Sequence, residues 1–444
     1  MNKQDFLEFL EGNVLSLFTG SEVVGEEPSS VRDACVAQGV GGSVLVKFKK
    51  SDEYRFIIKR VQPFKKFEIA IIKTIIAEMG KIYVTKIAQE YRRQIEHMIM
   101  ERAICKAITV NHSTLQTLLT ELSSWSQRTY EGARTNFGFV ISNKKAKESN
   151  DNLSIKNFLR KDFCALLSDG TDTFIEISSN GYLLNYLSNT KINNEDLFVP
   201  LEYLKIANLC TGSKIGVCLL PDGDILLFKE KALIFARRSG NWVCFSHQVI
   251  IDKLADKVGD GEEIRKALYL SSLDTSFKKC GGCVVHISNN DRYNVLKHIN
   301  AADVLIEDCY NHIMEENKSK SFFSDLTEEI KYPPYHEFIK KERCAKTANL
   351  IKIIKGRKFH ELSRKLRQEL IGIDGATVID YDGSIIAVGA IIKIDAGSSG
   401  GGRLAAARML SNYGISIKIS NDGSIQGFRT DRSKLRVKPL FVIG

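Results

Sequence analysis

The sequence contains no apolar stretch long enough to cross a membrane. The longest apolar run near its end, residues 385–392, is far shorter than the roughly 20 residues that a transmembrane helix needs. The opening residues MNKQDFLEFLEGN also lack the basic stretch and apolar core of a secretory signal peptide. Both absences predict a cytoplasmic protein with no membrane as partner.

Proline is scarce, and the cysteines form no recognisable framework. The chain has seven prolines in 444 residues and no long polar tract, which argues against extended disorder. Its ten cysteines stand at irregular spacing, which fits a reducing compartment better than a set of disulfides. A globular chain of this length is expected to form two or three domains.

The chain carries a net charge of +10, which weakly favours anionic partners such as nucleotides or nucleic acid. Much of the excess lies between residues 352 and 367, in Lys352, Lys355, Arg357, Lys358, Arg364, Lys365 and Arg367. A basic helix face of this kind is usually solvated. The stretch also lacks interleaved aromatic residues, so nucleic acid is a possible but not a favoured partner.

Changes in pattern along the chain predict an α/β fold with three domains. Residues 1–150 mix helix and strand, with a hairpin at residues 43–61 and an amphipathic helix at residues 65–80, and read as a sensor-like domain. Residues 151–255 contain short strands separated by turn signals and form a β-rich regulatory module. No internal repeat is evident beyond a likeness between the last two hairpins.

The third domain, residues 256–444, is expected to hold a mixed sheet flanked by helices. A strand at residues 283–287 follows a first helix, and helical patterns continue to about residue 370. Two hairpins come next, with Asp-Gly turns at residues 382–383 and 422–423. A glycine-rich loop and a helix separate these hairpins.

The glycine-rich loop, residues 396–403, is the strongest local indication of a ligand site. Its glycines, Gly401 and Gly402 among them, let backbone amides approach a ligand, and the helix that follows adds free N–H groups. Arg403 at the helix start can clamp a phosphate with its planar guanidinium. The alternative is a simple connector, and the loop does not match the P-loop pattern.

A second candidate is Asp374, which is followed by Gly375 and Ala376 at the start of an apolar strand. A carboxylate in this place can hold Mg²⁺ or Mn²⁺ against a phosphate, and the two small residues leave room beside it. Taken alone, an aspartate in such a position is more often a simple turn residue.

Together these motifs resemble those of the diadenylate cyclase family, over about the last 40% of the chain. That family carries an Asp-Gly-Ala motif, a Gly-Thr-Arg-His-Arg-Ala-Ala motif and a strand end with Ser-Glu-Glu. Residues 374–376 match the first motif in full, residues 401–407 (GGRLAAA) match the second in part, and residues 420–423 (SNDG) are similar to the third.

The resemblance implies synthesis of cyclic di-AMP from two ATP molecules, gated by the N-terminal sensor region. It implies that Asp374 holds Mg²⁺ or Mn²⁺ and acts in catalysis with Arg403, that Gly375 and Ala376 lie against the nucleotide, and that Gly401, Gly402 and Arg403 hold phosphates. Asp422 would be a second acidic metal contact. Because each domain would hold one ATP, a homo-oligomer with face-to-face domains is also implied.

Two of these motifs depart from the family pattern. Leu404 and Ala405 stand where the family has His and Arg, and Asn421 and Asp422 stand where it has a pair of Glu residues. The first two changes remove two contacts to triphosphate. A catalytically inactive nucleotide-binding regulator therefore remains the alternative to an active cyclase.

Overall fold

The structure is a computed structural model of the chain. It describes residues 3–18, 20–28, 35–48, 54–60, 63–82, 91–109, 111–147, 152–188, 191–192, 194–255, 261–321, 332–394, 401–430 and 439–444. The chain divides into two compact units, Met1–Ser246 (unit 1) and His247–Gly444 (unit 2). Within the described ranges, no helix combines the length and apolar character needed to span a bilayer.

The first part of unit 1 packs helices against a small antiparallel sheet of order β1-β4-β3-β2. Its strands are β1 (Glu22–Pro28), β2 (Val36–Gln38), β3 (Val44–Val46) and β4 (Tyr54–Lys59). Its helices are α1 (Lys3–Phe9), which continues into a π-helical turn, α2 (Lys66–Ile82) and α3 (Arg92–Ile108). The pairing of β3 with β4 confirms the expected hairpin, and α2 confirms the expected amphipathic helix.

The second part of unit 1 is a seven-stranded sheet of order β13-β12-β11-β10-β7-β8-β9. Its strands are β7 (Phe137–Ile141), β8 (Phe174–Ile177), β9 (Leu183–Leu187), β10 (Ile215–Leu219), β11 (Ile225–Lys229), β12 (Ala232–Arg238) and β13 (Asn241–Cys244). The helices of this part are α4 (His112–Trp125), α5 (Ile155–Leu159) and α6 (Leu204–Leu209), and a short hairpin joins β5 (Thr129–Tyr130) to β6 (Ala133–Arg134).

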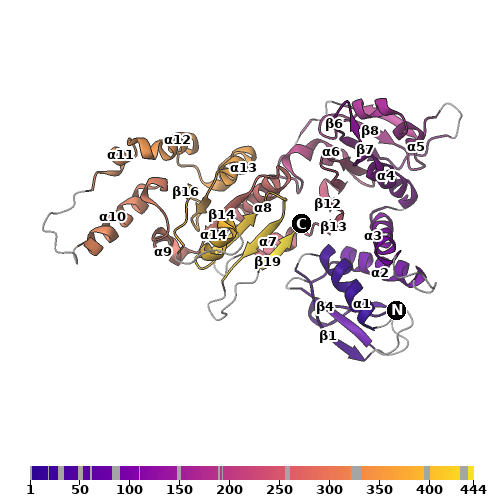
Figure 1. Ribbon diagram of the computed structural model, residues 1–444, viewed down its shortest axis with the longest axis horizontal. Helices are drawn as coiled ribbons and strands as arrows, with labels where there is room; N and C mark the ends of the chain where they lie inside the picture. Colours follow the sequence, from indigo (N-terminus) through magenta and orange to yellow (C-terminus); the bar gives the residue numbers. More distant parts are fainter. Residues whose placement is uncertain are drawn as a thin grey trace. The chain divides into compact units, whose positions relative to one another are not determined.

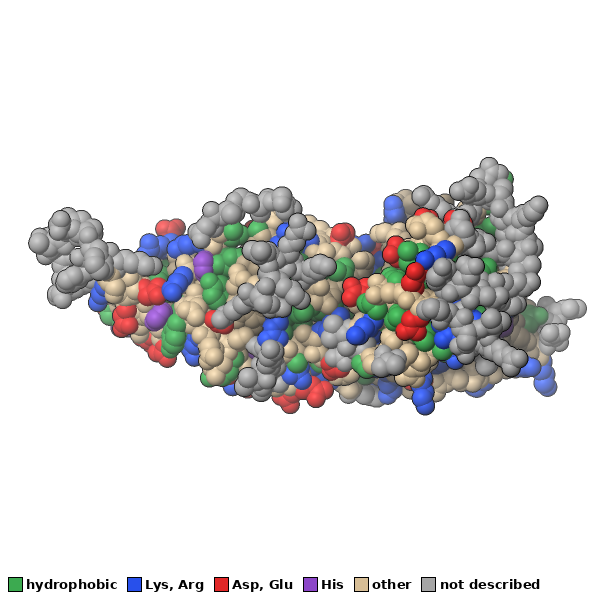
Figure 2. All heavy atoms as spheres, turned by 90° about the horizontal axis from the view of Figure 1, so that it is seen from below, with side chains coloured by type: hydrophobic (Ala, Val, Ile, Leu, Met, Phe, Trp, Pro, Cys, Tyr) green, Lys and Arg blue, Asp and Glu red, His purple; other side chains and the backbone are tan. Residues whose placement is uncertain are grey.

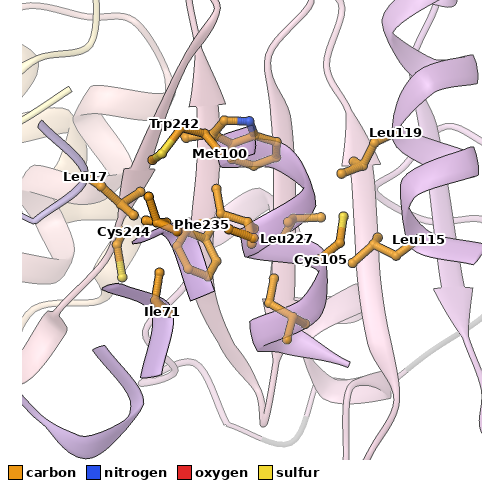
Figure 3. Packing of buried hydrophobic residues seen from close by; sticks show 14 of the residues in the cluster. Leu17, Ile71, Met100, Cys105, Leu115, Leu119, Leu227, Phe235, Trp242 and Cys244 are labelled. Carbon is orange, nitrogen blue, oxygen red and sulfur yellow. The ribbon is translucent and has the colours of Figure 1, made fainter. Parts of the chain in front are cut away.

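One continuous apolar core joins the two parts of unit 1. Figure 3 shows side chains of α2, α3 and α4 converging with those of β11, β12 and β13, among them Ile71, Met100, Leu115, Phe235 and Trp242. Because this core extends across the expected boundary at residue 150, that boundary falls inside unit 1. The expected boundary at residue 255 lies close to the division after Ser246.

Unit 2 is a six-stranded mixed sheet with helices around it (Figure 1), in the order β16-β15-β14-β17-β18-β19. Its strands are β14 (Gly282–Ile287), β15 (Ala376–Ile379), β16 (Ile385–Ala390), β17 (Gly414–Ile419), β18 (Ile425–Phe428) and β19 (Pro439–Ile443). Its helices are α7 (His247–Lys253), α8 (Glu262–Phe277), α9 (Arg292–Leu296), α10 (Glu307–Ser321), α11 (Tyr335–Phe338), α12 (Ala345–Ile354), α13 (Arg364–Gly372) and α14 (Gly402–Leu410). Both units confirm the α/β class.

Alternation along β14 sets the two faces of this sheet. Cys283, Val285 and Ile287 share a core cluster with residues of α14, which packs on β14 and β17. Gly282 points to the opposite face, where Ile371 of α13 is so close that a Cβ on Gly282 would lie 2.7 Å from its Cγ2 atom. Helices α13 and α8 pack together on that face.

A buried ion pair joins α8 to α13. The Nε and Nη2 atoms of Arg364 donate to the two carboxylate oxygens of Asp274 at 2.7 and 2.8 Å, and both side chains are almost fully buried. Arg367 is buried as well. The expectation of a solvated basic face is therefore wrong for these two arginines, because the turn of α13 points them inward.

The large sheets of the two units repeat one arrangement of strands. Strands β7 to β12 of unit 1 and β14 to β19 of unit 2 follow the same spatial order, β9-β8-β7-β10-β11-β12 and β16-β15-β14-β17-β18-β19. In each sheet the first two strands along the chain are parallel and the other neighbours are antiparallel. The expectation of no further internal repeat is therefore wrong.

Helices occupy matching places in the two repeats. The helix before the first strand packs on the helix before the second strand, α4 on α5 in unit 1 and α8 on α13 in unit 2. The helix before the fourth strand packs on the first and fourth strands, α6 on β7 and β10, and α14 on β14 and β17. We call residues 112–244 the first copy and residues 262–443 the second copy.

Strand register also agrees between the copies. Ile177 pairs with Leu183 in β8–β9, and Ile379 pairs with Ile385 in β15–β16, so both members of this pair recur 202 residues later. In the next hairpin, β10–β11 and β17–β18 correspond at a constant difference of 200 residues. Five residue types recur there unchanged, at Ile215, Asp222, Gly223, Ile225 and Phe228 and again at Ile415, Asp422, Gly423, Ile425 and Phe428.

Candidate functional site

A cavity of about 370 Å³ opens in unit 2 where β15 begins, β16 ends and α14 begins. It is lined by Cys283, Asp374, Gly375, Ala376, Ala390, Ile391, Ile392, Ile394, Gly402, Arg403 and Ala406. The fold thus brings together five of the residues singled out in the sequence, although the two motifs lie on separate elements. The size is in the range of ordinary small-molecule sites.

Asp374 stands at the mouth of this cavity because the chain turns sharply after it. Gly375 has φ +104°, and a Cβ there would lie 2.5–2.8 Å from the backbone of Gly389 and Ala390. Only glycine fits this position. After this turn, the side chain of Asp374 is 89% exposed, so its carboxylate can contact a ligand bound in the cavity.

Arg403 lies opposite Asp374, at the second residue of α14. One guanidinium nitrogen, Nη1, donates to the side-chain oxygen of Asn421 at 3.1 Å, and Nη2 lies 3.9 Å from Oδ1 of Asp374. Arg403 is 36% exposed, so its charge is accessible from the cavity. The guanidinium is therefore held in place from one side while its other side faces the ligand space.

Gly281 makes this placement possible, because it has no side chain where the tip of Arg403 lies. A Cβ on Gly281 would lie 1.9 Å from Nη1 of Arg403 and 2.4 Å from Oδ1 of Asn421. Neither Gly281 nor Asn421 was expected to contribute to the site. Gly281 directly precedes β14, and the adjacent glycines Gly281 and Gly282 are the local sequence signal of a close approach at this strand end.

The remaining wall of the cavity is apolar. Ile391 is 66% exposed and Ile394 is 38% exposed, which places two large apolar side chains in contact with solvent beside the charged pair. Such a wall suits the base or sugar of a nucleotide, with Arg403 near its phosphates. Burial raises the pKa of the Cys283 thiol to about 12, against the opposing effect of Arg403, so this thiol is not a nucleophile at neutral pH.

The glycines at the start of α14 differ in their roles. Gly401 is the N-cap residue and has φ +88°, which favours glycine there. Gly402 lines the cavity, and a Cβ on it would meet nothing within 4 Å. The rest of the expected loop, residues 396–400, lies outside the described residues.

Asp422, expected as a second metal contact, does not line the cavity. Its Oδ1 atom accepts a hydrogen bond from the amide of Ser424 at 2.9 Å and so closes the turn between β17 and β18. Leu404 packs against the apolar core, and Ala405 is half-buried on α14. Leu404 and Ala405, the two departures from the family motif, therefore do not line the cavity.

Comparisons with protein-family models, curated proteins and solved structures give no match to this chain.

The side chains at the cavity can hold a metal ion only if a bound ligand supplies further coordinating atoms. Among the described residues, no group of three or more His, Cys, Asp or Glu side chains is arranged to hold an ion, and Asp374 is the one carboxylate that lines the cavity. Mg²⁺ keeps several waters and is commonly held by one or two carboxylates together with substrate phosphates. Asp374 suits that role for an ion that arrives with a nucleotide.

The surface gives little support to nucleic-acid binding. In the face drawn in Figure 2, Lys and Arg side chains lie interspersed with Asp and Glu side chains among the described residues. Nucleic-acid-binding surfaces usually gather basic residues along one face. With Arg364 and Arg367 buried, the basic stretch at residues 352–367 also offers fewer charges to a partner than its sequence suggested.

Proposed function

We propose that unit 2 binds a nucleoside triphosphate in this cavity and that two such domains, facing each other, join two ATP molecules into cyclic di-AMP. The observation that carries the proposal is the meeting of Asp374, Gly375, Ala376, Gly402 and Arg403 around one cavity. The motifs that support the resemblance to diadenylate cyclases are thus neighbours in space.

In the binding step, Arg403 and the first amides of α14 hold the phosphates. Those amides have no partners within the helix, and the start of a helix carries a partial positive charge. The base and sugar lie against the apolar wall formed by Ile391, Ile392 and Ile394. Asp374 would hold a Mg²⁺ or Mn²⁺ ion that arrives with the triphosphate.

In the reaction, the 3′-hydroxyl oxygen of each ATP attacks the α-phosphorus of the other. Each attack forms one P–O bond, breaks the bond to pyrophosphate and releases the hydroxyl proton. The metal ion would neutralise phosphate charge and lower the pKa of the attacking hydroxyl. We further propose that unit 1 gates this activity, since the residues that line the cavity belong to unit 2.

Calorimetry with ATP and Mg²⁺ tests the binding step. Arg403→Ala should weaken binding about tenfold or more, because a charge-assisted contact is worth roughly 1.5–3 kcal/mol. Arg408→Ala is the matched control, since Arg408 lies exposed on the same helix and does not line the cavity. Equal affinities for both variants would contradict the proposed phosphate contact.

Incubation with ATP and Mn²⁺, followed by mass spectrometry, tests the reaction. A cyclic dinucleotide should form, and Asp374→Asn should lower its rate of formation on the order of 10²-fold or more. Absence of any cyclic product, with ATP binding intact, would instead establish the second candidate, a nucleotide-binding regulator without turnover. That candidate is favoured because, among the described residues that line the cavity, one carries a carboxylate and one a cationic side chain.

A further inference from the structure

Because the fold is repeated, residues that line the cavity of unit 2 have corresponding positions in the first copy. Register matches Ile141, which pairs with Ile177 and Ile215, to His286, which pairs with Ile379 and Ile415. The same register, followed toward the start of each strand, matches Gly138 to Cys283. It also matches Phe174 to Ala376, and Asp172 to Asp374.

Phe174 occupies the space that the cavity has in unit 2. It is fully buried, and its ring lies so close to β7 that a Cβ on Gly138 would be 2.6 Å from its Cδ1 atom. In unit 2 the corresponding pair is Ala376 and Cys283, both of which line the open cavity. The first copy thus has a large ring and a glycine where the second has a small residue and a thiol.

The charged pair is also closed in the first copy. Lys205, the second residue of α6, forms a direct ion pair with Asp172. In unit 2, Arg403 is the second residue of α14 and is kept 3.9 Å from Asp374 while Asn421 binds it. An ammonium group directly paired with its aspartate offers less to a phosphate than a guanidinium held apart from it.

The groups that support the arginine in unit 2 are missing from the first copy. Register places Asn136 at the position of Gly281 and Pro221 at the position of Asn421. The segment before α6, residues 188–203, contains no glycine, whereas α14 follows a glycine-rich loop. Each feature that opens the cavity in unit 2 therefore has a closed or missing counterpart.

We infer that the first copy is a second nucleotide-binding fold whose ligand site is closed by Phe174 and by the Lys205–Asp172 ion pair, so that each chain binds one nucleotide, in unit 2. The stoichiometry rests on the proposed nucleotide binding, whereas the closure of the first copy rests on its packing alone. The first copy keeps the fold and lacks the ligand.

Calorimetric stoichiometry tests the inference. Titration of the full chain with ATP and Mg²⁺ should give one site per chain, weakened about tenfold by Arg403→Ala and unchanged by Lys205→Ala. Two sites per chain, or one site lost with Lys205→Ala and retained with Arg403→Ala, would overturn it. If no ATP binds at all, the proposed function is refuted instead. The closure of the first copy is then tested by the Phe174→Ala variant described next.

Exchanging the residue that closes the site tests its packing. Ala376→Phe, which copies Phe174 into unit 2, should abolish ATP binding while the far-ultraviolet circular dichroism stays unchanged; retained binding would overturn the role of the ring. Phe174→Ala should lower the thermal unfolding midpoint, because it empties a filled site. Phe163→Ala is the control, since Phe163 is 51% exposed. Equal midpoints for these two variants would show that the first copy is not closed by Phe174, whatever the nucleotide result.

Discussion

At the scale of single residues, the guanidinium of Arg403 depends on two residues that are distant from it in the sequence. Asn421 accepts its hydrogen bond from one hairpin, and Gly281 leaves it room before β14. A long arginine side chain loses considerable rotamer entropy when a ligand fixes it. Holding the group before the ligand arrives reduces that cost at the moment of binding.

The first prediction concerns Asn421. Asn421→Ala removes the acceptor that holds Arg403, so ATP affinity should fall, by up to about tenfold if the hydrogen bond contributes about 1.5 kcal/mol. Asn421→Asp keeps an acceptor in place and should retain most of the affinity. Calorimetry compares the variants, and unchanged binding by Asn421→Ala would show that Arg403 needs no such partner.

The second prediction concerns Gly281. Gly281→Ala puts a methyl group where the tip of Arg403 lies, which should displace the guanidinium and weaken ATP binding while the fold is kept. The atoms that collide with the new methyl group are the ends of side chains, which can move. Gly261→Ala is the matched control, because its Cβ would meet only Ile264, at 3.9 Å. Equal affinity for the two variants would contradict the prediction.

The third prediction concerns Asp374. Because this side chain is 89% exposed, Asp374→Asn should leave the unfolding free energy within about 0.5 kcal/mol of the unchanged protein. Metal-dependent turnover should fall on the order of 10²-fold or more, since the amide cannot replace a carboxylate as a ligand. Initial rates across a Mn²⁺ series measure this, and a folded variant with full turnover would refute the assignment.

Some site residues could be predicted from the sequence and others could not, because only some of them act through neighbours in the chain. Asp374, Gly375 and Arg403 belong to short local motifs, so their roles are readable from neighbours in the chain. Gly281 and Asn421 contribute through contacts that only the folded sheet creates. Asp422 was chosen by its place in a motif, but the side-chain direction set by its turn keeps it out of the cavity lining.

At the scale of elements, the α8–α13 pair depends on a buried charge. Asp274→Ala would remove the carboxylate that pairs with the buried Arg364, so we predict a loss of about 3–5 kcal/mol of unfolding free energy, measured by urea denaturation. The control is Lys278→Ala, which removes an ion pair between the C-cap residue of α8 and Glu369 of α13. That pair is 35% and 48% exposed, so the loss should be less than about 1 kcal/mol. Similar losses for both variants would contradict this account.

Strands and amphipathic helices were predictable because their apolar periodicity is local. The repeat of the fold was not predicted, because the connections differ between the copies. Residues 142–173 join the first two strands of the first copy, whereas residues 288–375, with α9 to α13, join those of the second. The recurrence of Asp-Gly turns at residues 222 and 422 was present in the sequence, but a single hairpin is too common to indicate a duplicated domain.

At the scale of the whole molecule, the closed first copy determines which domains can pair productively. If each reacting ATP needs a facing ATP, two second copies from two chains must meet, and activity per chain should rise with protein concentration. Mixing active chains with a large excess of Asp374→Asn chains should therefore lower the product formed per active chain. Activity that does not fall, in a mixture shown to exchange subunits, would exclude a reaction between chains.

Two sheets of one design in a single chain create a hazard during folding, because a hairpin of one copy can pair with the strands of the other. Misassembly between similar domains is a known failure of repeat proteins. The copies differ where such an exchange would matter. Cys218 of β10 is fully buried, whereas Lys418 stands at the corresponding place in β17. A β17–β18 hairpin inserted into unit 1 would take that ammonium out of water, at a cost of several kcal/mol, so sequence divergence between the copies also keeps each hairpin in its own sheet.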